Sequence, residues 1–210
     1  MGMKKLLLLL VLSLMFGCNN KKKNKTLPLN IEINRDYEEN LIKKEEVKIN
    51  VPLNWEVLSE SNKNFLLNHL FENSQYRGKI DYILTLSNSE IGSYPIISVL
   101  IQKDYEITKL GINEFAERFI NTMNNSMLTI LDGMKGIITD HNDIGNYIDN
   151  KNQILYIINE GTVANVGQIK TIAAIIFKKE YIISLTLSSY PDEFDKFKTA
   201  IQIMANSTRI

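Results

Sequence analysis

The residues of this sequence with the greatest capacity for chemistry are one thiol and two imidazoles. Cys18 is the only cysteine among the 210 residues, so no disulfide can form within the chain. His69 and His141 stand too far apart to form the paired histidines of a zinc-binding helix, and no second cysteine is present to join them. We therefore interpret both histidines as ordinary surface or turn residues, and we expect no metal and no cofactor.

The segment from Asp140 to Gly145 begins like a calcium-binding loop but lacks two of its ligands. Ile144 stands in the place of the third oxygen ligand and Lys151 in the place of the closing glutamate, so we interpret the segment as a hairpin turn. The sequence also lacks a Gly-x-Ser-x-Gly elbow, a Ser-x-x-Lys serine and a Walker glycine loop. These absences predict a protein that is not an enzyme. The alternative is a hydrolase whose two carboxylates meet only in three dimensions.

Four aromatic residues fall near expected turns in the first half of the chain, where amphipathic rings often mark recognition surfaces. They are Trp55, Tyr76, Tyr82 and Tyr94. A single tryptophan after a first strand is more often a core residue, and this is the interpretation that we favour for Trp55.

The composition fits one ordinary globular domain with a tail, because 44% of the residues are apolar and 23% are charged. The formal charge of the whole chain is zero. Residues 1–17 contain Lys4 and Lys5 and no acidic residue, so the remainder has 22 basic and 24 acidic side chains and a charge of −2. This near-balance argues against nucleic acid as a partner, since phosphate binding requires clustered positive charge.

The first residues have the three parts of a secretion signal. Lys4 and Lys5 form a positive start, the stretch from Leu6 to Phe16 is apolar except for Ser13, and Gly17 is a small residue before Cys18. A membrane-spanning helix needs about 20 apolar residues, which exceeds this run. N-myristoylation would require Ser or Thr at the sixth position, where the chain has leucine.

The run Leu14-Met15-Phe16-Gly17-Cys18 resembles the bacterial lipobox. The resemblance implies that residues 1–17 are a lipoprotein signal peptide and that Cys18 becomes the lipidated first residue of the mature protein. The membrane would then be a partner through the lipid on Cys18. Ordinary secretion and a cytoplasmic location are the alternatives. Asn19 is not aspartate, which favours the outer membrane if the cell has one.

Residues 18–44 are expected to form a lipidated cysteine followed by a tether. The stretch from Asn19 to Asn24 contains only Asn and Lys, Pro28 interrupts regular structure, and no sustained period is seen before residue 45. The lysines from Lys21 to Lys25 would lie near anionic lipid headgroups, where each adds about 1 kcal/mol of attraction. The alternative is a solvated linker that holds the domain away from the bilayer.

Residues 45–210 show the periodicity of a single globular domain. Val47, Ile49 and Val51 alternate with polar residues, and a turn at 52–55 follows. Apolar residues at steps of three and four predict a helix over 113–131, with Asn113 as its N-cap and Gly133 just past its end. The further strands predicted are Ile80–Leu86, Ile96–Ile101, Gly136–Thr139, Gly145–Ile148, Ile154–Ile158, Gln168–Phe177 and Tyr181–Ser188.

The strand Gln168–Phe177 is apolar on both faces, which predicts a central strand that is covered above and below. Lys178 to Glu180 make a tight connection to the next strand, and a final helix is predicted over 191–206 with Ser189 as its cap. The order of elements predicts an α+β fold in which an antiparallel sheet is flanked by helices on both faces, as an α/β/α sandwich.

This order resembles the PsbP-like and DcrB-like lipoprotein domains over about residues 46–208. The resemblance rests on the helix at Asn113–Leu131, the Gly167-Gln168 start of a long strand, the Tyr181 hairpin return and the final helix with Phe194 and Phe197. It implies a non-catalytic, lipid-anchored module of the cell envelope that binds an unknown envelope protein or small ligand, and it assigns no role to any residue. The alternative is an envelope hydrolase with an unrecognised carboxylate pair.

Overall fold

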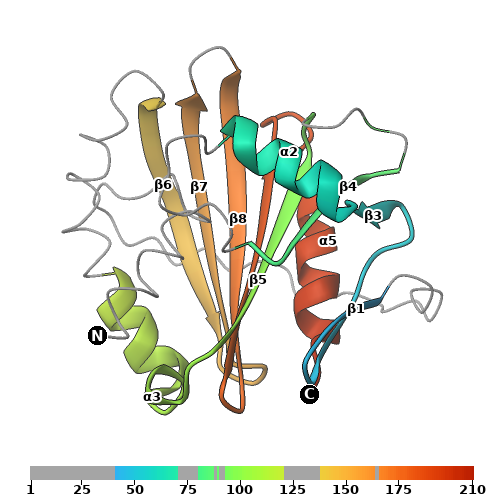
Figure 1. Cartoon of the computed structure of the whole chain (residues 1–210). Helices are drawn as coiled ribbons and strands as arrows, with labels where there is room; N and C mark the ends of the chain where they lie inside the picture. The colour runs from blue at the N-terminus through green and yellow to red at the C-terminus, as the bar shows by residue number, and fades with distance from the viewer. Residues whose placement is uncertain (1–40, 71–79, 88, 90–92, 121–137, 164–165) are drawn as a thin grey trace.

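A computed structural model describes residues 41–210 except 71–79, 88, 90–92, 121–137 and 164–165. Its main feature is an antiparallel sheet of seven strands, as the sequence predicted (Figure 1). The spatial order of the strands is β3 (Trp55–Val57), β4 (Tyr82–Leu86), β5 (Ile96–Lys103), β9 (Tyr181–Ser189), β8 (Gly167–Lys178), β7 (Ile154–Val163) and β6 (Ile138–Asp149).

The strand β8 lies near the middle of this sheet and is buried on both faces. Ile172, Ala174 and Ile176 face one core, and the alternate residues Ala173, Ile175 and Phe177 face the other. None of the six is more than 5% exposed. The prediction of a central strand covered above and below is therefore confirmed, and its cause is the unbroken apolar run of residues 172–177.

Helices cover the two faces of the sheet (Figure 1). The helix α5 (Phe194–Ser207) packs on the face of Ile172 through Phe197, Ile201 and other apolar residues. The helical stretch 111–120 packs on the opposite face through Ile112, Phe115 and Phe119. Both α2 (Glu60–Leu70) and the short α3 (Tyr105–Thr108) lie on that second side. The predicted sandwich is confirmed.

A separate two-stranded hairpin at the start of the described chain pairs with the C-terminal residues. Its strands β1 (Leu41–Lys44) and β2 (Val47–Asn50) are antiparallel, and β2 also pairs with the C-terminus through two hydrogen bonds between Lys48 and Arg209. The strand β1 corrects the expectation that no regular element occurs before residue 45. Its alternation is too short to recognise in sequence, and Ile42 is only 2% exposed because the hairpin packs on the main core.

The strand β6 corrects a second expectation, since it replaces two short strands and the predicted turn between them. The segment from Asp140 to Gly145 lies inside this one strand and pairs with β7. The pairing register shifts between Asp143 and Gly145, so one extra residue enters the strand as a bulge. That irregularity interrupts the alternation of side chains, which is why the sequence pattern resembled a turn.

The helix starts also differ from those predicted. The helix predicted over 113–131 begins earlier, at residue 111, where Gly111 adopts φ +74° after α3. Asn113 therefore lies within the helix and is not its N-cap. Residues 121–133 of that prediction lie outside the described residues. The helix α5 begins at Phe194, and the Ser189 hydroxyl donates to the carbonyl of Tyr190 instead of capping it. The helix α2 was not predicted, because its first turns contain mostly Ser, Asn and Lys.

Candidate functional site

The predicted lipidation residue Cys18 and the signal 1–17 lie outside the described residues, so lipidation stays a prediction. The structure does show how the first described strand, β1, is attached to the rest of the domain. The Lys44 ammonium donates to an Asp81 carboxylate oxygen at 2.6 Å, and the other oxygen of Asp81 accepts from the Ile101 amide at 2.7 Å. The Tyr82 hydroxyl donates to the Lys43 carbonyl at 3.0 Å. The first strand is therefore held firmly against β4 and β5.

The two histidines lie on different elements. His69 belongs to α2 and His141 to β6, which is the edge strand far from β4. Their side chains are outside the described atoms, so their interpretation as ordinary residues stays a prediction. Within the described ranges, no group of three His, Cys, Asp or Glu side chains is arranged to hold a metal ion. None of the helices in those ranges has the length and apolar character that a bilayer crossing requires.

The four predicted aromatic residues do not form one surface. Trp55 is 1% exposed and packs edge-on against Phe197 with ring centroids 6.0 Å apart, so the prediction that it is a core residue is confirmed. Tyr82 binds the carbonyl of the first strand, and Tyr76 lies outside the described residues. Tyr94 packs against another aromatic residue at an end of the sheet.

That aromatic pair consists of Tyr94 and Tyr190, which we call the tyrosine rim. Tyr94 comes two residues before β5 and Tyr190 directly after β9, and the antiparallel pairing of Ile96 with Ser188 brings them together. Their rings meet edge to face with centroids 5.5 Å apart, and the Tyr94-Pro95 peptide bond is cis. Tyr190 is 39% exposed. Sequence reasoning missed Tyr190 because β5 and β9 are far apart in the chain.

The surroundings of Tyr94 in the rim favour its neutral hydroxyl. Burial raises the pKa of Tyr94 above its ordinary value, and the neighbouring Tyr190 adds to the effect. The Tyr94 hydroxyl therefore stays protonated at neutral pH, and each ring of the rim presents an apolar body with a hydroxyl that can donate or accept a hydrogen bond. Such side chains suit contact with a partner surface better than proton transfer.

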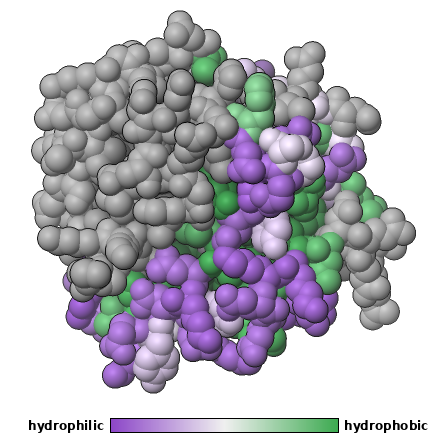
Figure 2. All heavy atoms as spheres, in the orientation of Figure 1, coloured by the Kyte–Doolittle hydropathy of each residue, from purple (hydrophilic) through white to green (hydrophobic). Residues whose placement is uncertain are grey.

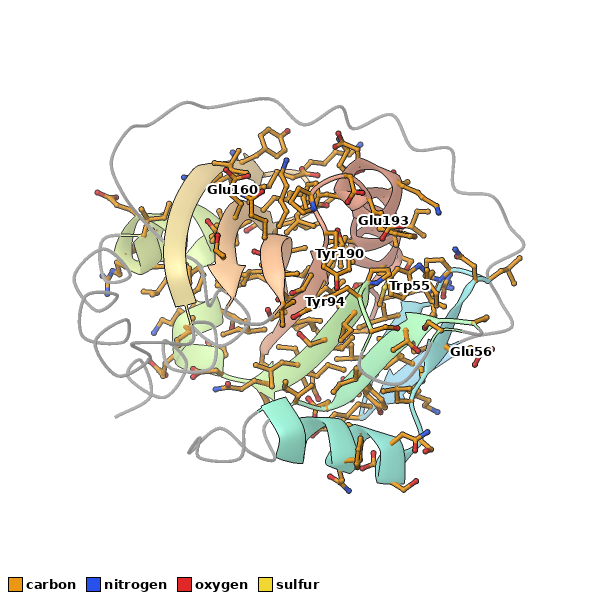
Figure 3. All side chains as sticks on the ribbon, turned by 90° about the horizontal axis from the view of Figure 1, so that it is seen from above. Trp55, Glu56, Tyr94, Glu160, Tyr190 and Glu193 are labelled. Carbon is orange, nitrogen blue, oxygen red and sulfur yellow. The ribbon has the colours of Figure 1, made fainter. Side chains whose placement is uncertain are left out.

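Three described carboxylates at this end of the sheet lie apart from one another. Figure 3 shows Glu56, Glu160 and Glu193 spread around the tyrosine rim, on β3, β7 and the turn before α5. A displaced carboxyl pKa occurs at Asp195, where the hydrogen bond from Lys198 lowers it, but this is an exposed pair along one helix. Neither arrangement resembles the paired acid and base of a hydrolase, which must lie within reach of one substrate bond.

Comparison with solved structures shows which fold this is. The chain is similar to cyanobacterial PsbP (CyanoP) from Synechocystis sp. PCC 6803, with a TM-score of 0.52 and 14% sequence identity over 81% of this chain and 91% of that chain. At this identity the likeness shows the fold alone. It confirms the PsbP-like fold that the sequence predicted.

Two further solved structures match with TM-scores below 0.5. One is LpqN, involved in cell envelope biogenesis of Mycobacterium tuberculosis, with a TM-score of 0.42 and 11% identity over 80% of this chain and 88% of that chain. The other is a protein of unknown function from Pseudomonas aeruginosa, with a TM-score of 0.34 and 15% identity over 77% of this chain and 89% of that chain. No protein-family model and no curated protein matches the chain.

Proposed function

We propose that this protein is a lipid-anchored lipoprotein of the cell envelope, whose PsbP-like domain binds a protein or small-ligand partner without catalysing a reaction. The observation that carries the proposal is the run Leu14 to Cys18, which follows a positively charged and apolar signal and places the only thiol of the chain at the position that accepts lipid. In this proposal the protein is attached to a membrane surface. In a cell with an outer membrane, that membrane is the one to which it is attached.

The energetics of the anchor support stable attachment. Each buried methylene of an acyl chain contributes about 0.8 kcal/mol, so two or more chains on Cys18 hold the protein where one chain is marginal. The lysines from Lys21 to Lys25 add about 1 kcal/mol each beside anionic lipid. The lipid is therefore the main anchor in this proposal, and the lysines are a minor addition that salt weakens.

The length of chain before the domain supports a module that reaches away from the bilayer. Residues 18–40 separate the lipid from the first described strand, and a fully extended chain of that length spans at most about 80 Å. The domain is thus free to meet a partner at some distance from the headgroups. The spread of the carboxylates around the tyrosine rim favours binding over hydrolysis, because no observed pair suits a catalytic acid and base.

Metabolic labelling with a fatty acid tests the anchor. The wild-type chain should take up label and partition with membranes into detergent. In Cys18→Ala the label should vanish and the precursor should persist uncleaved, because the acceptor thiol is gone. A matched control combines Cys18→Ala with Ser13→Cys, which restores a thiol five positions too early and should not restore label. Label that survives Cys18→Ala, or a wild-type chain that is wholly soluble, would contradict the proposal.

A further inference from the structure

One face of the sheet carries a group of polar residues in an otherwise apolar surface. We call this group the polar band. It lies on the face that packs against the helical stretch 111–120, beyond the apolar residues Ile157 and Ala173. Its members are Asn159 on β7, Thr171 on β8, Thr186 and Ser188 on β9, and Ser98 on β5.

The pairing registers show that the band is continuous across four strands. Asn159 is directly opposite Thr171, and Thr171 is directly opposite Ser188. Thr186 is directly opposite Ser98 on its other side. Residues opposite each other in neighbouring strands point to the same face, about 5 Å apart. The five side chains therefore form one polar area of the sheet surface.

The centre of the band is deeply buried, and its polar atoms lack protein partners. Asn159 is 0% exposed, Thr171 is 1% exposed and Thr186 is 4% exposed. Both amide atoms of Asn159 and the hydroxyls of Thr171 and Thr186 have no hydrogen-bond partner within the part of the chain that the structure describes. Buried polar groups are costly when unpaired, and in folded proteins the great majority have a partner. Four such atoms gathered on one face point to a bound group that pairs them.

The chemistry of the band limits what that group is. The asparagine amide donates through Nδ2 and accepts through Oδ1, and a threonine hydroxyl does both. The charged neighbours Glu160 and Lys170 adjoin Asn159 and Thr171 along their strands, so they point to the opposite face. An uncharged group that both donates and accepts hydrogen bonds can pair all four of these atoms, and no charged side chain described on this face of the band is placed to balance an ion.

We propose that the polar band is an internal binding site for hydroxyl groups, supplied either by water or by an uncharged polyol or carbohydrate. This inference is independent of the lipid anchor, since it rests on β5, β7, β8 and β9 alone. Figure 2 shows hydrophilic residues over α2 and along the lower edge of this view, with hydrophobic residues beside α2.

Isosteric substitution in the full chain, purified in detergent, distinguishes an occupied site from a dry core. In Thr171→Val and Thr186→Val the hydroxyl is replaced by a methyl group of similar size. If the band binds hydroxyl groups, each variant loses a hydrogen bond and its Tm falls by roughly 2–4 °C. Thr171→Ser, which keeps the hydroxyl, should retain more stability than Thr171→Val despite its smaller volume.

A matched control sets the scale of the effect. Thr208→Val removes a buried hydroxyl that donates to the Met204 carbonyl at 2.9 Å, so its Tm should fall by a similar amount. If the band is instead dry and unpaired, Thr171→Val and Thr186→Val relieve the cost of an unpaired hydroxyl. Their Tm would then equal or exceed that of the wild type, which would overturn the proposal.

Native mass spectrometry of the same samples separates the two sources of hydroxyl groups. A polyol or carbohydrate should appear as an added mass on the wild-type chain and should be lost or reduced in Thr171→Val. A wild-type chain without added mass, together with a lowered Tm in Thr171→Val, identifies water as the bound group. An added mass that Thr171→Val and Thr186→Val leave unchanged, together with unchanged Tm values, would count against a site at the polar band.

Discussion

At the scale of single residues, two buried tyrosines show that a tyrosine hydroxyl can raise or lower the stability of the fold, depending on whether it has a hydrogen-bond partner. The Tyr181 hydroxyl donates to a Glu45 carboxylate oxygen at 2.7 Å and so links β9 to the turn between β1 and β2. The Tyr156 hydroxyl is buried in the main core and has no hydrogen-bond partner among the described residues. Stacking on Tyr147 positions its ring, but nothing observed compensates the desolvated oxygen.

We expect Tyr156→Phe to leave the free energy of unfolding unchanged or to raise it, because the removed hydroxyl makes no bond within the described structure. Tyr181→Phe is the matched comparison and should lower that free energy, since it breaks the bond to Glu45. Urea denaturation followed by tryptophan fluorescence measures both, with Trp55 as the only reporter. A large loss of stability in Tyr156→Phe would show that its hydroxyl has a partner after all.

The burial of Tyr156 also predicts how the free energy of unfolding changes at high pH. Burial raises the pKa of Tyr156, and the nearby Asp149 and Tyr147 add to the rise. A neutral form favoured by folding is fully stabilising below the unfolded pKa of about 10, and this stabilisation is lost as the pH rises above that value. The stability of Tyr156→Phe should accordingly fall less steeply above pH 10 than that of the wild type.

At the scale of elements, the parts that sequence could predict are those whose burial pattern repeats over a long strand or helix. The strands β8 and β9 were predicted within one or two residues because long runs of their side chains are buried, and Lys179 completes their tight turn with φ +51°. The strand β6 was divided because of its bulge, and α2 was missed because its first turns show no apolar stripe. Short or irregular elements owe their structure to contacts that are distant in sequence.

The candidate sites also differ in whether their residues are close together in the sequence. The prediction for Cys18 rests on its immediate neighbours, since a peptidase recognises a local segment, and it stays a prediction. Tyr190 and the polar band could not be predicted, because their residues meet only through the pairing of β5 with β9 and of β7 with β8. An asparagine or threonine within an apolar strand was the available signal. Without the register, it could not be told from an ordinary outward-facing residue.

The strand β1 gives a prediction that contrasts two adjacent residues. Ile42 is 2% exposed and packs in the main core, whereas Leu41 is 48% exposed. Ile42→Ala should lower the free energy of unfolding by about 2–4 kcal/mol through lost burial and the cavity that remains. Leu41→Ala should change it by less than about 0.5 kcal/mol. If residues before 45 were only a tether, the two variants would be equally stable in thermal or urea denaturation.

At the scale of the whole molecule, the chain joins the domain at one end and the tyrosine rim lies near the other. The amide of Asn50, whose partner across the hairpin is Leu41, donates to the hydroxyl of Ser207 at the C-terminal end of α5. Tyr190 precedes the N-terminal end of the same helix. With 14 residues, α5 is roughly 20 Å long. In the proposed arrangement the anchored segment joins the domain away from the tyrosine rim, which leaves the rim accessible to a partner.

This geometry predicts that contact with a partner protein depends on position. A photo-crosslinking phenylalanine derivative at position 190 should give a crosslinked product of defined mass in living cells, because an aromatic side chain there lies at the proposed contact. The matched control is position 105, since Tyr105 is also an exposed tyrosine, at 61%, but follows the opposite end of β5. Crosslinking should depend on Cys18, because unanchored or unprocessed chains do not meet an envelope partner in the same way. Equal products from both positions, or products from position 105 alone, would place the partner elsewhere on the domain.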